Sequence, residues 1–181
     1  MITAQFSDSF LPIVDGVGRV VYSYAAGITK KGHPCYVIAP MNDFGYRGGL
    51  PFDLIDYHGI SVPVYQYKAG TPALDMHYNT RINAIKPDII HSHSPFFAGM
   101  EALRIAKKHH VPLIGTFHSR YYEDFYKVTK SEELAEIGTK IVVSFFKQCD
   151  EVWTVSNSSA EELHRYGYKG DIEIVPNGTD I

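Results

Sequence analysis

Two short apolar runs decide the fold, DIIHSH at residues 88–93 and LIGTFH at residues 113–118. A continuous apolar run of this length is typical of a strand buried on both faces, as in a parallel sheet. Both runs end in histidine, and in open parallel sheets ligands bind just outside the carboxyl ends of the strands. The two runs therefore predict neighbouring strands that deliver imidazole side chains to the edge of the sheet where a site would lie.

Strand-like runs and helical patterns alternate along the sequence before and after these two runs. Strands are predicted at residues 2–6, 35–39, 54–57, 61–67, 89–91, 112–116, 151–155 and 172–175. Helices are predicted at residues 16–31, 75–85, 97–109, 131–148 and 156–166, a turn at His58-Gly59, and loops at residues 41–53 and 117–130. This alternation predicts an α/β fold, in which helices cover both faces of a mainly parallel sheet.

Length and composition limit the classes of protein that fit. The chain has 181 residues, of which 45% are hydrophobic and 20% charged, and this suits one domain with a substantial core. The net charge of -3 argues against a nucleic-acid partner, because such proteins carry a strong basic excess. Cys35 and Cys149 lack a zinc or redox spacing, so we expect buried free thiols and a reducing, cytosolic compartment. No apolar stretch approaches the roughly 20 residues that span a bilayer, and the first residues do not form a secretory signal.

The loop at residues 7–18 joins the first strand to the N-terminus of the first helix. Exposed N–H groups and the helix dipole attract phosphate at such a place, and glycine lets the backbone approach a ligand closely. Gly16 is therefore a candidate phosphate-binding residue, although a glycine here also serves simply to start a helix. The loop matches neither a dinucleotide fingerprint, since Val21 stands at the third glycine position, nor a P-loop. Asp15 is the acidic residue beside this place, where it could orient a hydroxyl group or act as a base.

His91 and His93 stand two residues apart on one predicted strand and so share one of its faces. Such a pair can bind a metal, but no suitably spaced Cys, Asp or Glu completes a ligand set, so no metal is expected. We interpret His91 as a core histidine whose ring is satisfied by hydrogen bonds. His93, at the end of the strand, is better placed to meet a ligand at the rim.

His118 leaves the second apolar run at the same edge of the sheet. Aromatic and basic side chains follow it directly, among them Arg120, Tyr121, Tyr122 and Tyr126. They suit an acceptor pocket whose aromatic faces stack on a sugar ring, or an anchor at a membrane interface. The alternative is a loop that packs its aromatic rings against the edge of the sheet.

Motifs along the whole chain resemble the N-terminal domain of GT-B glycosyltransferases of family 4. The matching stretches are PIVDGV (12–17), KGHP (31–34), KPDIIHSHSP (86–95), VPLIGTFH (111–118), DEVWTVS (150–156) and VPNGTD (175–180). Each is weak alone, but their order and spacing make the resemblance specific. It covers essentially all 181 residues.

The resemblance implies a Rossmann-like domain at residues 1–175 and the start of an interdomain linker at residues 176–181. It implies that this domain mainly binds the acceptor, and that a C-terminal domain outside this chain holds a nucleotide-sugar donor. Transfer of a hexose with retention of anomeric configuration is implied, without a metal or other cofactor, and the isolated domain is expected to be inactive. The expected location is cytoplasmic, with peripheral contact at the inner face of the membrane.

The resemblance also implies roles for individual residues. Gly16 would lie in the loop whose backbone approaches the donor diphosphate, and Asp15 would contact acceptor or donor hydroxyls. His118 matches the histidine beside the transferred sugar and is the expected catalytic residue, while His93 matches a rim position near the acceptor pocket. Many relatives carry Gly-Gly in the first loop, whereas this chain has Asp15-Gly16, which puts one close approach to phosphate in doubt.

The acceptor is the least defined part of this expectation. Arg120, Tyr121 and Tyr122 are acceptor-binding candidates by position, and the stretch FHSRYY (117–122) is similar to relatives that glucosylate diacylglycerol. Two other functions compete with sugar transfer. One is a non-catalytic carbohydrate- or ligand-binding module, and the other is a different nucleotide-using Rossmann-type enzyme, such as an epimerase of nucleotide sugars.

Overall fold

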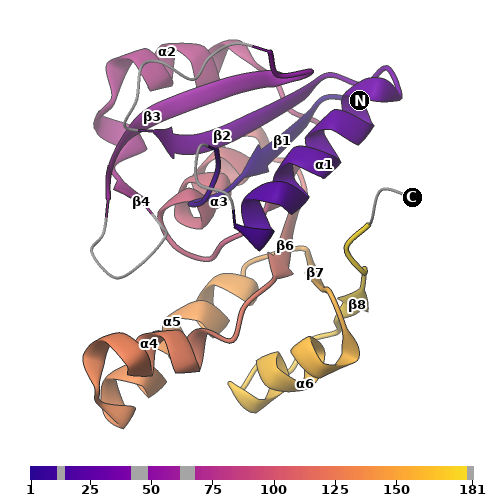
Figure 1. Ribbon diagram of the computed structural model, residues 1–181. Coiled ribbons are helices and arrows are strands. Elements are labelled where there is room, and N and C mark those ends of the chain that lie inside the picture. Colours follow the sequence, from indigo (N-terminus) through magenta and orange to yellow (C-terminus); the bar gives the residue numbers. More distant parts are fainter. Residues whose placement is uncertain (12–14, 42–48, 62–67, 179–181) are drawn as a thin grey trace.

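A mainly parallel sheet runs through the protein, which is seen in a computed structural model that describes residues 1–11, 15–41, 49–61 and 68–178 (Figure 1). Its eight strands have the order β4-β3-β2-β1-β5-β6-β7-β8. Every pair of neighbours is parallel except β3 and β4. The strands are β1 Thr3–Phe6, β2 Cys35–Met41, β3 Asp53–Ser61, β4 Lys68–Gly70, β5 Ile89–Ser92, β6 Leu113–Phe117, β7 Glu151–Thr154 and β8 Glu173–Ile174. The predicted α/β class is confirmed.

Helices pack on both faces of this sheet. They are α1 Gly16–Lys30, α2 Met76–Ala84, α3 Phe97–His109, α4 Tyr121–Thr129, α5 Glu132–Phe146 and α6 Asn157–Arg165, with a short 3₁₀ turn η1 at Pro72–Leu74. Strand β2 shows the two faces clearly, because Val37 and Ala39 pack with α1, whereas Ile38 packs with α2 and α3. Right-handed crossovers to either side of β1 place α1 on one face and the other crossover helices on the opposite face. Figure 1 shows α1 in front of β1.

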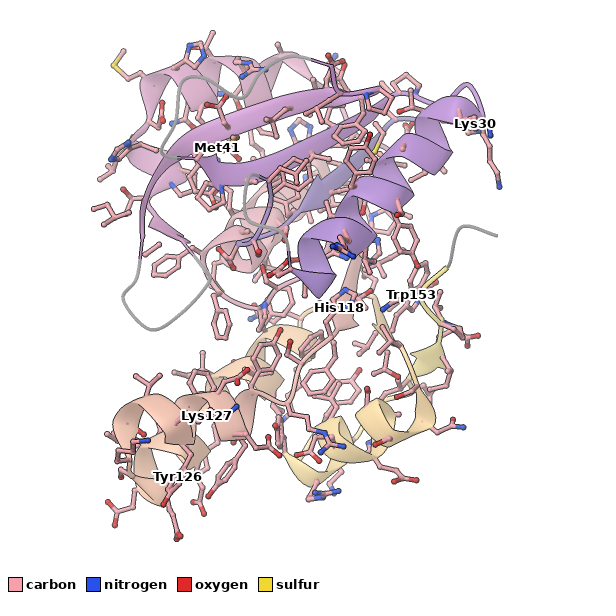
Figure 2. The ribbon with its side chains drawn as sticks, viewed as in Figure 1. Lys30, Met41, His118, Tyr126, Lys127 and Trp153 are labelled. Carbon is pink, nitrogen blue, oxygen red and sulfur yellow. The ribbon has the colours of Figure 1, made fainter. Side chains whose placement is uncertain are left out.

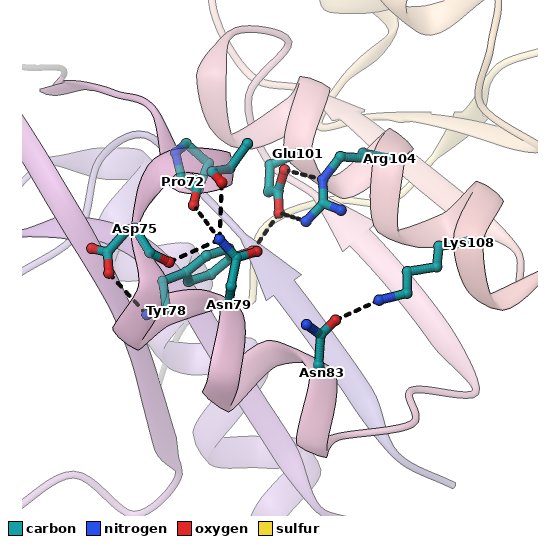
Figure 3. A network of polar contacts seen from close by, with 9 residues as sticks. Pro72, Asp75, Tyr78, Asn79, Asn83, Glu101, Arg104 and Lys108 are labelled. Atoms are coloured by element: carbon teal, nitrogen blue, oxygen red, sulfur yellow. Dashed lines mark hydrogen bonds and ion pairs between the residues drawn. The ribbon is translucent and has the colours of Figure 1, made fainter.

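A polar network ties α2 to α3 on the more heavily covered face (Figure 3). The hydroxyl of the buried Tyr78 donates to Glu101 Oε1 over 2.8 Å. The same carboxylate accepts two hydrogen bonds from Arg104, at 2.6 and 2.8 Å. A buried charge is tolerated where it is paired and hydrogen-bonded, so this network holds the two helices in one fixed arrangement.

Two local predictions differ from the structure. The predicted turn at His58-Gly59 is wrong, because β3 runs through it: residues up to His58 pair with β2, and the strand then pairs with β4 from Gly59 onward. The predicted loop at residues 117–130 contains helix α4, whose first turn carries Glu123 and Asp124. Residues 42–48 of the predicted loop and 62–67 of the predicted strand lie outside the described residues. Among the helices that the structure describes, none is long and apolar enough to cross a membrane.

Candidate functional site

The carboxyl ends of three neighbouring strands bring the candidate residues together. Strand β1 lies between β2 and β5, and β5 lies between β1 and β6. In this register Gln5 on β1 stands opposite His91 on β5. His93 follows the end of β5, and His118 follows the end of β6. Distant parts of the sequence therefore meet at one edge of the sheet.

The three histidines form one hydrogen-bonded and stacked group. His93 Nδ1 lies 3.1 Å from His118 Nε2, and His93 Nε2 lies 2.7 Å from Gln5 Oε1. The ring of His91 is 4.0 Å from that of His93, measured between centroids, and its Nε2 is 2.7 Å from Thr116 Oγ1. The prediction that His91 is a core histidine satisfied by a hydrogen bond is confirmed.

His93 lies deeper than the sequence predicted. Its side chain is 1% exposed, so the ring lies beneath His118 and not at the open rim. The reason is one further rung of the sheet ladder, since the His93 N–H donates to the Phe6 carbonyl over 2.8 Å. This bond keeps residue 93 in the sheet after β5 formally ends. The half-buried His118 is the histidine of the group that reaches the surface.

Burial keeps these imidazoles neutral at pH 7. It lowers the pKa of His91 to about 3 and holds the pKa of His93 well below its usual range. Burial also lowers the pKa of His118 to about 4, although the negative charge of Asp15 opposes the shift. Desolvation disfavours the charged form of a histidine, and one charged ring would repel the others. Each ring therefore offers one hydrogen-bond donor and one acceptor.

Asp15 and Gly16 form the start of α1. Asp15 is the N-cap, and its Oδ1 accepts the Gly18 N–H over 2.6 Å while its Oδ2 accepts the Ser9 hydroxyl over 2.5 Å. Gly16 is exposed in the first turn, where unpaired N–H groups and the positive end of the helix dipole lie. In Figure 2, His118 lies just below this end of α1. Residues 12–14 of the same loop lie outside the described residues.

Asp8 is a buried carboxyl next to the site that sequence reasoning missed. It is 1% exposed, its Oδ1 accepts the Ala98 N–H over 2.8 Å, and its Oδ2 accepts the Ser94 hydroxyl over 2.7 Å. Burial raises the pKa of this carboxyl to about 6, against the hydrogen bonds from Ser94 and Ala98. The bonds tie the loop after β1 to the start of α3. An acidic residue two positions past a strand end was the available signal.

The residues after His118 divide between surface and core. Arg120 is exposed and precedes α4. Tyr122 is half-buried, and its ring stacks on that of Tyr126 with centroids 6.4 Å apart. Tyr121 is 3% exposed and packs against Phe96 and Phe117, so this predicted acceptor contact is a core residue in the structure. The alternative prediction, aromatic rings packed on the edge of the sheet, holds for Tyr121.

Comparison with known proteins settles the family. The sequence model described as Glycosyltransferase Family 4 matches residues 14–181. The chain belongs to glycosyltransferase family 4. The predicted family resemblance is thus confirmed, and the match includes Asp15, Gly16, His93 and His118.

Curated relatives of this family 4 chain cover nearly all of it. It is 25% identical to an alpha-monoglucosyldiacylglycerol synthase of Acholeplasma laidlawii, over 97% of this chain and 46% of the relative. A second alpha-monoglucosyldiacylglycerol synthase, from Streptococcus pneumoniae, is 21% identical over 97% of the chain and 40% of the relative. A GDP-mannose-dependent alpha-mannosyltransferase of Corynebacterium glutamicum is 28% identical over 92% of the chain and 41% of the relative. The chain thus spans less than half the length of these three relatives.

Solved structures show the same fold at low sequence identity. An alpha-glucosyltransferase in complex with UDP and a 13-mer DNA has a TM-score of 0.53 and 10% identity, over 99% of this chain and 42% of that chain. A putative UDP-N-acetylglucosamine 2-epimerase from Listeria monocytogenes has a TM-score of 0.51 and 12% identity, over 93% of this chain and 42% of that chain. At these identities the likeness supports the Rossmann-like architecture of this family 4 chain.

The sheet of this family 4 chain is open on the face beside α1. A groove of about 400 Å³ lies there, and its lining includes Tyr24, Gln5, His91 and Trp153. The Trp153 ring, labelled in Figure 2, meets the His91 ring edge-on, with centroids 5.1 Å apart. Within the described residues, no three His, Cys, Asp or Glu side chains are arranged to hold a metal ion. The chemistry that this site offers is hydrogen bonding by neutral imidazoles beside a helix N-terminus.

Proposed function

We propose that this chain is the acceptor-binding part of a glycosyltransferase that moves a hexose from a nucleotide-sugar donor to an acceptor hydroxyl. The observation that carries the proposal is the position of His118 at the carboxyl edge of the sheet, close to the start of α1, in a family 4 chain. The donor domain would follow residues 176–181, since the chain spans less than half of the relatives named above. The isolated chain would then bind acceptor but not catalyse transfer.

The proposed reaction makes separate demands on the two sides of the site. The bond from the anomeric carbon to the diphosphate breaks, a bond to the acceptor oxygen forms, and the acceptor hydroxyl loses its proton. Negative charge develops on the leaving diphosphate, and the N–H groups at the start of α1, near Gly16, are suited to stabilise it. His118 would hydrogen-bond the sugar or handle the acceptor proton, and Asp15 would contact hydroxyls. We propose retention of configuration and no metal ion.

A lipid is the acceptor that we propose. Two of the relatives named above are alpha-monoglucosyldiacylglycerol synthases, which supports an acceptor such as diacylglycerol. The segment after His118 carries one positive charge, from Arg120, and two stacked aromatic rings, from Tyr122 and Tyr126. Aromatic and cationic side chains suit an interface where one end is apolar and the other wet. The enzyme would accordingly be cytoplasmic and touch the inner face of the membrane.

The test is the turnover of the full-length protein with His118→Ala. We expect kcat to fall about 100-fold or more, the range for a lost group that takes part in proton transfer. The assay measures transfer from UDP-glucose and GDP-mannose to diacylglycerol and to sugar acceptors, and NMR of the product gives its anomeric configuration. The matched control is His33→Ala, an exposed histidine in the turn before β2, at the opposite end of the sheet. Unchanged turnover of a folded His118→Ala protein would remove His118 from the mechanism.

A further inference from the structure

A line of hydrogen-bonded side chains runs across three strands and ends at His118. It begins at Gln5 in the middle of the sheet, passes through His93 and reaches His118, with atom separations of 2.7 and 3.1 Å. Gln5 is 2% exposed and His93 1% exposed, so bulk water does not compete along most of the line. The rigid ladder between β1 and β5 fixes the spacing of its first members.

With the Gln5 side-chain amide oriented as in the structure, Oε1 toward His93, the chemistry of each atom sets where the protons lie. Gln5 Oε1 is a carbonyl oxygen and can only accept, so the His93 Nε2 that contacts it must carry a proton. A neutral imidazole has one N–H, so His93 Nδ1 has a lone pair and must accept from its partner. That partner is His118 Nε2, which therefore carries the proton of that ring.

We infer that Gln5 and His93 are positioning residues, which hold His118 in the tautomer with Nε2 protonated and present its Nδ1 as a hydrogen-bond acceptor. The described residues provide no hydrogen bond to this Nδ1, so within the described part of the protein it is open to a ligand. An acceptor atom on a ring that feels the negative charge of Asp15 favours a group that donates, such as a hydroxyl of a sugar or of the acceptor. It disfavours a phosphate oxygen, which has only lone pairs to offer. The role in transfer rests on the proposed function, whereas the tautomer does not.

Nitrogen NMR of the 181-residue chain labelled with ¹⁵N in its histidine rings tests the tautomer directly. At pH 7 the ring spectra distinguish a protonated nitrogen from an unprotonated one, and a His118→Gln variant assigns the signals of residue 118. We expect His118 and His93 to be protonated at Nε2 and unprotonated at Nδ1. A proton on Nδ1 of His118, or an equal mixture of the two tautomers, would overturn the inference.

A pair of variants separates positioning from general packing. Gln5→Leu removes the carbonyl oxygen that orients His93, so we expect His118 to populate both tautomers. His91→Gln is the control, because His91 is also buried and its ring contacts that of His93, but it bonds to Thr116. We expect this control to leave the His118 signals unchanged. If both variants disturb the tautomer equally, the effect is one of packing and the line has no special role.

Kinetics of the full-length protein then test the functional half of the inference. We expect Gln5→Leu to lower kcat about 10- to 100-fold, by analogy with the loss of a hydrogen-bond partner that orients a metal-ligating histidine. Full activity in a Gln5→Leu protein with mixed tautomers would show that orientation of His118 does not matter. If the wild-type tautomer is as inferred but no sugar is transferred, the proposed function fails and the tautomer stands. If sugar is transferred by a protein with Nδ1 protonated, the inference fails alone.

Discussion

His91, His93 and His118 lie in one group, yet each meets different surroundings. His91 bonds to Thr116 within the sheet, His93 is enclosed on every side, and His118 reaches the surface. The strand-end position of these histidines was predictable, because an apolar run followed by histidine places the ring at a known edge. The depth of His93 was not, because it depends on one backbone hydrogen bond to Phe6 on another strand.

Acid should destabilise the protein through these histidines. The pKa of His91 is about 3 in the folded state and 6.5 without burial, so between these pH values the unfolded chain binds more protons. Stability therefore falls as the pH is lowered from about 6.5, by up to about 1.4 kcal/mol per pH unit for this residue. Urea unfolding of His91→Gln between pH 4 and 7 should show a shallower loss than the wild type.

Replacing Asp8 should have the opposite effect on the acid dependence of stability. Its folded pKa of about 6 lies above its ordinary 3.8, so here the folded chain binds more protons, and Asp8 favours folding on acidification from pH 6 to 4. The Asp8→Asn protein should thus lose stability more steeply with acid than the wild type does. Equal slopes for the wild type and both variants would mean that neither group titrates as its surroundings imply.

Whether a helix could be predicted from the sequence depended on the residues at its two ends. Ser131, the first residue of the helix predicted at 131–148, is the N-cap of α5 and accepts the Leu134 N–H over 3.4 Å. Helix α4 escaped prediction, because Arg120 before it gives no side-chain cap and Lys130 after it takes the left-handed conformation that glycine usually marks. The helix packs against α5. One of these is the Phe125 ring, which lies over Gly138.

Two glycines within helices should respond in opposite ways to alanine. A Cβ at Gly99 in α3 would lie 2.2 Å from the Ser94 carbonyl oxygen, a backbone atom that cannot rotate away. A Cβ at Gly27 in α1 would meet nothing within 4 Å. We expect Gly99→Ala to destabilise by about 1–3 kcal/mol or more, and Gly27→Ala to stabilise by about 0.4–1 kcal/mol. Thermal unfolding of both variants measures this, and a stable Gly99→Ala protein would contradict the close packing of α3 on the site.

The whole molecule is a sheet that is covered unequally. The alternation of strands and helices in the sequence was enough to predict a parallel sheet, since consecutive parallel strands need a crossover. It was not enough to predict that β1 lies between β2 and β5, because strand order depends on which side each crossover takes. The groove beside α1 follows from that order, since the crossovers after β5 all lie on the other face.

The division of the proposed enzyme into two parts predicts what this chain binds alone. Apart from the N–H groups near Gly16, the donor-binding residues would lie in the other part, so calorimetric titration of the 181-residue chain with UDP-glucose or GDP-mannose should show no tight binding. The full-length protein under the same conditions provides the positive control. Micromolar binding by the chain alone would favour a nucleotide-using enzyme complete within these residues, such as an epimerase.

The central place of β1 has a consequence during synthesis on the ribosome. This strand is made well before its neighbour β5, because Thr3 pairs with Ile89. At about 5–20 residues per second, the partner strand emerges roughly 4 to 17 s after β1. During this time β1, whose residues are all buried in the folded protein, has no partner strand on its β5 side. The middle of the sheet, and with it the contact between Gln5 and His93, is still incomplete.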